Sequence, residues 1–245
     1  MRIDVAFSPA GLASQDVAGR PAFVIDALRA TSTICAALHH GARAVVPCAT
    51  PEDAVRLAQT LGADVVLAGE RQCLPIPGFH LGNSPREMTA AAVGGRTVAL
   101  STTNGTRALL AVAHAAHVHP LAPCNFSVAA ARARVLLEEG GDLLVVCAGR
   151  DNAFGLDDAY VAGRLLRAAL GGRTGRRGLN DGAIAALQLV RAYRDRWERP
   201  LRLSRAGREL ARVGLGDDVA YAAQPDIHPV LPRLHDRRLT AEAAA

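Results

Sequence analysis

The alternation of short apolar runs with longer Ala- and Leu-rich segments constrains the fold of this chain more than any other feature. Strand-length runs predict β-strands near 2–7, 21–26, 43–47, 63–68, 97–101, 117–121 and 143–148. The segments between and after them predict helices near 31–41, 51–61, 85–92, 105–115, 126–139, 156–170, 180–196, 204–213 and 217–223. This order is typical of a parallel sheet covered by helices on both faces. We therefore predict a three-layer α/β/α fold with a mostly parallel, mixed central sheet, as a single domain over 1–245.

Length and apolar content support a globular protein. The chain has 245 residues, and half of them are apolar, which is enough to bury a sizeable core. No apolar run approaches the roughly 18 residues of a membrane span, so no membrane partner is expected. The first eleven residues lack the features of a signal peptide, and a cytoplasmic location is the default expectation.

The basic residues are unusual because all 28 of them are Arg. The absence of Lys excludes a Walker-type phosphate loop and Schiff-base chemistry. Guanidinium groups suit bidentate binding of phosphate, sulfonate or carboxylate, although a GC-rich genome is the simpler cause of the bias. The net charge is +5, but no basic patch interleaved with aromatics is visible, so a nucleic-acid partner is not expected. A homo-oligomer is compatible with the sequence but not specified by it.

The five cysteines and the histidines show no familiar metal motif. The cysteines lack CxxC spacing, which predicts reduced thiols instead of a zinc ribbon or a disulfide scaffold. His39 and His40 close a predicted helix before Gly41, an ordinary C-terminal arrangement. His117 and His119 face one side of a short strand, where a metal pair is the less favoured alternative.

Three segments repeat the order strand, polar loop, helix: 24–38, 98–113 and 143–163. In open α/β sheets, ligands bind outside the carboxyl ends of the strands. The three polar turns are therefore expected to converge on one crevice.

The first turn places Asp26 at a strand end and Arg29 just before a helix start. A helix start binds anions, and Arg29 could fork onto phosphate oxygens. The alternative is ordinary capping by Thr31 or Ser32 with Asp26 solvated. Glu70 and Arg71 repeat the pairing of acid and guanidinium at the next strand end, where a solvated surface pair is the usual explanation.

The most unusual turn spans 101–107, where hydroxyl and amide side chains crowd around one glycine. A cap needs one such residue, whereas a phosphate cradle uses several. Its candidate anion-binding residues are Thr102, Thr103, Asn104, Gly105, Thr106 and Arg107. Earlier in the chain, Ser84 and Glu87 have the spacing of a capping box, which leaves Asn83 to approach a ligand.

The third turn carries Arg150 after a buried strand, followed by Asp157 and Asp158 at a helix start. Acids in a first helical turn are favoured by the helix dipole, but adjacent acids at a strand-end crevice are also typical Mg²⁺ ligands. Asp181 has the same two interpretations, with the structural one favoured.

These motifs resemble those of the 2-phosphosulfolactate phosphatases, the enzymes of the sulfolactate branch of coenzyme M biosynthesis. The similar blocks are IDALRATST (25–33), GER (69–71), GFHLGNSP (78–85), TTNGTRAL (102–109) and CAGRDNAFGLDDAYVAG (147–163). A weaker resemblance runs through 180–186, 204–218 and 224–232, so it covers nearly the whole chain. The family usually has Glu where Asp157 stands, so the acid at this position keeps its charge on a shorter side chain.

The resemblance implies a Mg²⁺-dependent phosphatase that converts (R)-2-phospho-3-sulfolactate to 3-sulfolactate and phosphate. We expect Asp26, Arg29 and Asp158 to be catalytic, and Asp26, Glu70, Asp157 and Asp158 to bind the metal, with Asp181 as a further helper. The expected substrate-binding residues are Arg71, Asn83, Thr102, Thr103, Asn104, Gly105, Thr106, Arg107 and Arg150. The competing hypotheses are a phosphatase for another small phosphorylated carboxylic acid and a non-enzymatic protein that binds anions or nucleic acid.

Overall fold

The computed structural model describes residues 1–171 and 178–242, and its strands form two sheets. The first sheet is entirely parallel, in the order β1 (Ile3–Ala6), β8 (Leu143–Cys147), β2 (Pro21–Ile25), β7 (His117–Leu121). The second sheet is mixed, in the order β5 (Leu74–Pro75), β4 (Val65–Arg71), β6 (Thr97–Ser101), β3 (Ala44–Pro47), β10 (Arg238–Ala241), β9 (Pro232–His235). The predicted α/β class with mostly parallel strands is confirmed, and the strands are shared between two sheets.

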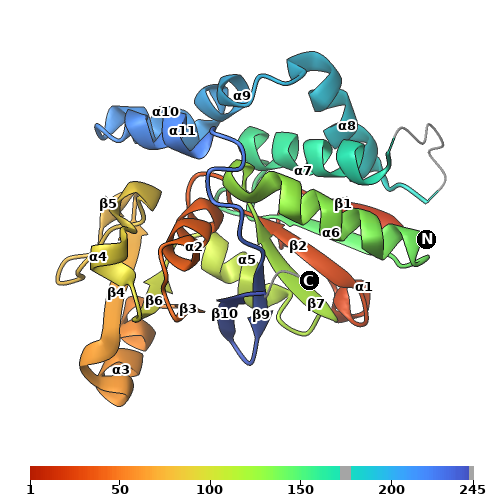
Figure 1. The fold of residues 1–245 in the computed structure, drawn as a ribbon. Helices are drawn as coiled ribbons and strands as arrows, with labels where there is room; N and C mark the ends of the chain where they lie inside the picture. Colours follow the sequence, from red (N-terminus) through yellow and green to blue (C-terminus); the bar gives the residue numbers. More distant parts are fainter. Residues whose placement is uncertain (172–177, 243–245) are drawn as a thin grey trace.

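Helices cover both faces of the first sheet (Figure 1). The helices α6 (Phe126–Glu138) and α7 (Leu156–Ala169) pack on one face, with α8 (Asp181–Tyr193) against α7 and β1. On the other face, α2 (Ala30–His39) and α5 (Gly105–Ala111) also contact β3 of the second sheet. These two helices therefore lie between the sheets, while α3 (Pro51–Leu61) packs against β4 and β6.

The period of two along each strand explains this layering, because successive side chains point to opposite faces. In β2, Phe23 and Ile25 join the core under α6 and α7, whereas Val24 faces the core between the sheets. In β6, Leu100 joins the core between the sheets, whereas Ala99 packs toward α3. Strands that are apolar on both faces thus require helices on both sides.

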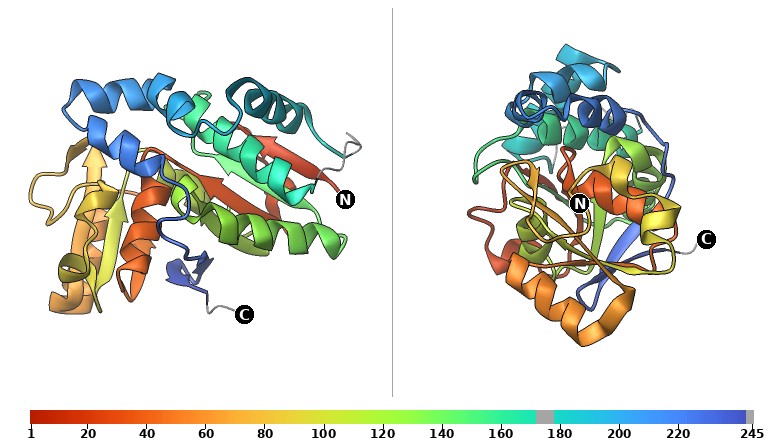
Figure 2. Two further views of the ribbon diagram at one scale, coloured as in Figure 1. Left: turned by 45° about the horizontal axis from the view of Figure 1, so that its top comes forward. Right: turned by 90° about the vertical axis from the view of Figure 1, so that its left-hand side faces the viewer.

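The C-terminal third forms a layer of short helices: α9 (Glu198–Leu203), α10 (Arg205–Arg212) and α11 (Gly216–Ala222). Figure 2 shows this layer at the opposite end of the molecule from α3. The remaining short elements are α1 (Ser14–Val17), α4 (Ala90–Val93), η1 (Gly62–Asp64), η2 (Pro85–Glu87) and η3 (Pro123–Asn125). None of the described helices combines the length and the apolar character needed to cross a bilayer.

Most predicted elements are present, but the helix predicted over 85–92 is wrong. The chain there forms the 3₁₀ turn η2 and, separately, the single-turn helix α4, whose N-cap is Thr89. The predicted capping box is also wrong, because the Glu87 carboxylate accepts the N–H of Gly82 at 2.5 Å. The elements α1, α9, β5 and the β9–β10 hairpin were not predicted, because they are short and have weak periodicity.

Candidate active site

The carboxyl ends of four strands, two from each sheet, meet at one place. Strand β2 leads to the Asp26 turn, and β8 leads to the turn with Gly149. Strand β4 carries Glu70 near its carboxyl end, and β6 leads to the turn that begins at Thr102. Side chains cross between these turns, as the following contacts show. The predicted convergence of polar turns is therefore confirmed, although the turns come from two sheets instead of one.

Asp26 lies directly after β2 and is 8% exposed. Its Oδ1 accepts the N–H of Ala30 at 3.3 Å, at the start of α2. A Cβ at Gly105 would lie 2.6 Å from Oδ2, so the backbone of α5 approaches the other carboxylate oxygen closely. The hydroxyl of Thr31 donates to the carbonyl of Asp26 at 2.8 Å. The hydroxyl thus braces the turn instead of capping the helix, and Asp26 is buried instead of solvated.

Asp158 connects the ends of the two central strands of the first sheet. Its Oδ1 accepts the N–H of Ala27 at 2.9 Å, and its Oδ2 accepts the N–H of Gly149 at 3.0 Å. Gly149 has a φ of +62°, and a Cβ there would collide with neighbouring backbone oxygens, so this turn requires glycine. Asp158 therefore holds the two turns in register beside Asp26.

Glu70 plays the corresponding bridging role in the second sheet. One carboxylate oxygen accepts the N–H of Cys73 at 2.9 Å, and the other accepts the N–H of Thr103 at 2.8 Å. Glu70 is only 8% exposed, so the solvated surface pair with Arg71 is not present in the structure. Glu70 orders the loop after β4 and the turn after β6 together.

A small enclosed cavity of about 20 Å³ lies among these turns. This volume accommodates roughly one water-sized occupant. It is lined by Asp26, Leu28, Asn104, Gly149, Arg150, Phe154, Gly155, Asp157, Asp158, Arg205 and Ala206. Three carboxylates thus share the cavity, and α10 supplies part of its wall. Neither Glu70 nor Asp181 lines it, and Asp181 is exposed at the start of α8.

The three cavity acids are held in an environment that disfavours their charge. Burial raises the pKa of Asp26 to about 7, and repulsion from Asp157 adds to the rise. Burial also raises the pKa of Asp157 to about 6. The pKa of Asp158 is raised well above its usual value by burial and then by Asp157 and Asp26. Such a cluster is stabilised by any cation or proton placed among the carboxylates.

In the turn after β6, two threonines bond to each other, whereas two other polar residues keep unused hydrogen-bonding groups. The hydroxyl of Thr106 donates to the carbonyl of Thr102 at 2.8 Å, and the hydroxyl of Thr102 accepts the N–H of Thr106 at 3.1 Å. Both threonines are buried and hold the start of α5. By contrast, the hydroxyl of Thr103 is buried without a hydrogen-bond partner, and Asn104 lines the cavity. The phosphate-binding role of this turn stays a prediction.

Three of the four strand-end arginines already bind protein groups. Arg29 donates to Asp218 and to the carbonyl of Cys73, both at 2.7 Å. Arg71 donates to the carbonyl of Glu70 at 2.6 Å and to the hydroxyl of Ser101 at 3.0 Å. Arg150 forms an ion pair with Glu209 of α10. Arg107 is exposed on the first turn of α5, and no described residue forms a hydrogen bond or ion pair with it.

Asp218 is the buried acid that sequence analysis missed. It is 1% exposed on α11, and it also accepts the hydroxyl hydrogen of Ser84 at 2.8 Å. Next to Ser84, Asn83 is 4% exposed, and its side-chain oxygen has no hydrogen-bond partner. The Asp217–Asp218 pair resembles an ordinary helix start in sequence, and only the fold shows that Asp218 faces Arg29.

Comparisons with known proteins identify the family of this chain. A family model described as 2-phosphosulpholactate phosphatase matches residues 6–237. The chain belongs to this family. A Symbiobacterium thermophilum protein named "Probable 2-phosphosulfolactate phosphatase" is 40% identical over 220 residues, which cover 89% of this chain and 93% of the relative. Proteins of the same name from Deinococcus radiodurans and Thermus thermophilus are 44% and 43% identical, each over 87% of both chains. Membership in the 2-phosphosulpholactate phosphatase family places the chain among the phosphoric monoester hydrolases.

The donor set at the cavity fits a hard divalent cation in its chemistry. Asp26, Asp157 and Asp158 offer carboxylate oxygens, which Mg²⁺ prefers, and the cavity has room for one small occupant. In the described part of this family member, no three acidic side chains have oxygen atoms close enough together to bind one metal ion without rearrangement. Mg²⁺ usually keeps several water ligands, so it can be held by two carboxylates directly and by others through water.

Proposed function

We propose that this chain hydrolyses (R)-2-phospho-3-sulfolactate to 3-sulfolactate and inorganic phosphate, and that the reaction depends on Mg²⁺. The observation that carries this proposal is the shared cavity of Asp26, Asp157 and Asp158 at the strand ends, in a member of the 2-phosphosulpholactate phosphatase family. Buried carboxylates that repel one another are costly in a fold, which favours a site where a cation is used.

Asp26 and Asp157 are assigned to hold Mg²⁺, and Asp158 is assigned a positioning role, because its two oxygens accept the backbone N–H groups of two different turns. When bound there, Mg²⁺ would polarise a phosphoryl oxygen and offset negative charge in the transition state. Asp158 keeps the Asp26 and Gly149 turns at a fixed separation. Glu70 does the same for the Thr103 turn, which makes Glu70 a positioning residue in this proposal.

The substrate carries phosphate, carboxylate and sulfonate groups, so its recognition requires several cationic and polar donors. Arg150 lines the cavity, and Arg107 is exposed on the first turn of α5, three residues after the cavity residue Asn104, so these guanidiniums are assigned to the anionic groups. Asn104 and the unpartnered hydroxyl of Thr103 supply neutral donors on the same turn. Arg29 acts through the protein, since Asp218 and Cys73 hold its guanidinium.

The cavity is too small for a three-carbon substrate with three anionic groups. Its wall must therefore move for the substrate to enter, and α10 forms part of that wall. Arg205 and Ala206 close the cavity, and the helix is held by the ion pairs Arg150–Glu209 and Arg205–Asp151. An incoming anion would compete with Glu209 for Arg150, which couples binding to opening.

Phosphate release tests the proposal. The full chain is stripped with EDTA, dialysed, and assayed with (R)-2-phospho-3-sulfolactate, with 2-phospholactate, which lacks the sulfonate, and with other phosphorylated carboxylic acids. We expect activity only after Mg²⁺ is added, and the highest kcat/KM with the sulfonated substrate. Release that is unchanged after exhaustive chelation would disprove the metal requirement. A higher kcat/KM with another acid would assign a different substrate, and no release from any ester would favour an anion-binding protein.

Matched variants separate site chemistry from general damage. Asp26→Asn changes a buried acid at the cavity and keeps an Oδ1 that can accept the N–H of Ala30, and Asp64→Asn changes an exposed acid at the surface of the second sheet. We expect the first to lower kcat/KM by roughly 10²-fold or more and the second to leave it unchanged. Equal activities of the two variants would show that the cavity is not the active site.

A further inference from the structure

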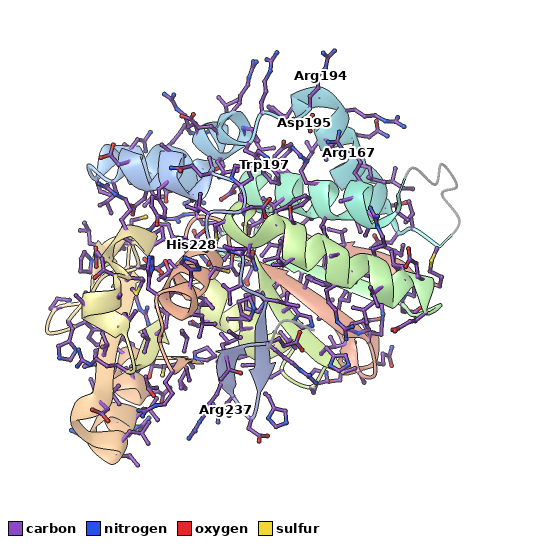
Figure 3. The ribbon with its side chains drawn as sticks, in the orientation of Figure 1. Arg167, Arg194, Asp195, Trp197, His228 and Arg237 are labelled. Atoms are coloured by element: carbon purple, nitrogen blue, oxygen red, sulfur yellow. The ribbon has the colours of Figure 1, made fainter. Side chains whose placement is uncertain are left out.

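A cluster of three histidines lies outside the acidic site. His39 and His40 end α2, and His228 lies in the segment that joins α11 to β9. Figure 3 shows His228 beside α2. The ring centroid of His228 lies 4.8 Å from that of His39 and 5.3 Å from that of His40. The segment after α11 therefore brings a third imidazole to the two at the helix end.

One nitrogen from each ring lies within 4.8 Å of the others. Among residues 1–171 and 178–242, this is the one group of three or more metal-ligating side chains whose donor atoms have converged. Three nitrogen ligands of a tetrahedral Zn²⁺ lie about 3.4 Å apart, given a Zn–N distance of about 2.0–2.1 Å. His39 is exposed, so a rotation of its side chain can close the remaining gap.

Hydrogen bonds leave the required lone pairs available on His40. Its Nδ1 bonds the carbonyl of Ala36 at 2.9 Å, and a carbonyl can only accept. The proton of neutral His40 is therefore on Nδ1, and Nε2 presents a lone pair. This arrangement, in which one ring nitrogen donates to the backbone, is the usual one for a histidine that binds a metal through the other.

His228 supplies the second, independent observation. The residue is 3% exposed, and its Nε2 forms a hydrogen bond with the hydroxyl of Tyr221 at 3.0 Å. Its Nδ1 is buried and has no hydrogen-bond partner. A buried nitrogen without a partner costs free energy, so a structure that retains one calls for a ligand.

The surroundings of His228 and His39 disfavour a charged imidazole. Burial, followed by His39 and His40, lowers the pKa of His228 to about 4. Burial and His40 lower the pKa of His39 as well.

We propose that His39, His40 and His228 form a second metal site, selective for late first-row divalent cations, with Zn²⁺ as the best fit. Three imidazole nitrogens suit Zn²⁺, Co²⁺, Ni²⁺ and Cu²⁺, whereas Mg²⁺ prefers oxygen ligands. The exposed His39 side leaves a fourth position open to water. The bound ion links the C-terminal end of α2 to the segment after α11, and Asp218 of α11 holds Arg29 at the other end of α2.

Zn²⁺ titration of the EDTA-stripped full chain tests this site, by calorimetry in the presence of saturating Mg²⁺ so that the acidic site is occupied. We expect one equivalent to bind, and Co²⁺ to give the visible absorption of a nitrogen-ligated site. His39→Asn and His228→Asn should each weaken binding by roughly 100-fold or more. Zn²⁺ should raise the Tm of the wild type and leave that of His39→Asn unchanged.

His235→Asn is the matched control, because His235 is an exposed histidine on β9. It should bind Zn²⁺ as the wild type does. His39 is exposed, so its replacement is not expected to disturb folding, and circular dichroism verifies this for both histidine variants. The proposal is overturned if the wild type binds no Zn²⁺ equivalent, or if His39→Asn and His228→Asn bind as tightly as His235→Asn.

Discussion

The Nη1 atom of Arg29 lies 2.7 Å from Oδ2 of Asp218, and both side chains are almost completely buried. The two residues are 189 positions apart, so this ion pair connects the turn after β2 to α11. On the surface, the adjacent Asp217 pairs with Arg86 at 3.3 Å, and its side chain is 82% exposed. Neighbouring acids thus form one buried and one solvated ion pair.

Asp218→Asn is expected to lower the free energy of unfolding by about 3–5 kcal/mol, because it leaves the Arg29 guanidinium buried without a counter-charge. Asp217→Asn should cause no measurable change, since exposed ion pairs contribute little. Urea denaturation monitored by circular dichroism measures both. Similar losses from the two variants would contradict the assignment of Asp218 as the structural partner of Arg29.

Asp157→Asn is expected to stabilise the metal-free protein at pH 8, because it removes one of three repelling buried carboxylates. Relief of about 1 kcal/mol corresponds to a Tm increase of about 2–4 °C in a chain of this size. The same change should lower kcat/KM by roughly 10²-fold or more. Thermal scans with and without Mg²⁺ provide the check. A Tm below that of the wild type without metal would argue against repulsion at this site.

Gly105→Ala is expected to lower both stability and activity, because its Cβ would lie 2.6 Å from Oδ2 of Asp26 and would collide with Ala30. Overpacking of this kind typically costs about 1–3 kcal/mol. Gly216→Ala, at the start of α11, is the control, since its Cβ would meet only Ala211 at 3.9 Å. Denaturation and phosphate release are measured for both. A Gly105→Ala protein as stable and active as the control would show that this close approach is absent.

His119 is expected to make stability depend on pH. The residue is fully buried, its Nδ1 bonds the carbonyl of Pro232 at 3.0 Å, and burial lowers its pKa. Unfolding raises that pKa to its ordinary value, so the unfolded chain binds more protons as the pH falls through about 6.5. The contribution of His119 is therefore complete above about 6.5 and is lost toward the lower pKa of the folded state.

Free energies of unfolding at several pH values for the wild type and His119→Gln measure this contribution. We expect the advantage of the wild type over the variant to shrink as the pH falls below about 6.5. His235→Asn, which changes an exposed histidine, should follow the pH dependence of the wild type. An advantage of the wild type over His119→Gln that is independent of pH would contradict the prediction.

Local sequence patterns were sufficient for the strands and for the convergence of the polar turns. Seven predicted strands are present, because runs that are apolar on both faces have few alternatives to a buried sheet. The turns with Asp26, Thr103 and Asp158 meet because strand ends in such sheets gather on one edge. The short elements were not predictable, since the two residues of β5 or the single turn of α4 carry no period.

The chain order of apolar and polar residues thus determined the α/β class and the convergence of the acidic turns. Tertiary structure alone decided which charges are paired. Arg29 pairs with Asp218 and Arg150 pairs with Glu209, and the partners are too far apart in sequence for any local pattern to predict the pairs. It also decided that His228 joins His39 at the end of α2. The physical reason is that burial and contact set the energy of a charged or polar group, and both depend on which distant segments pack together.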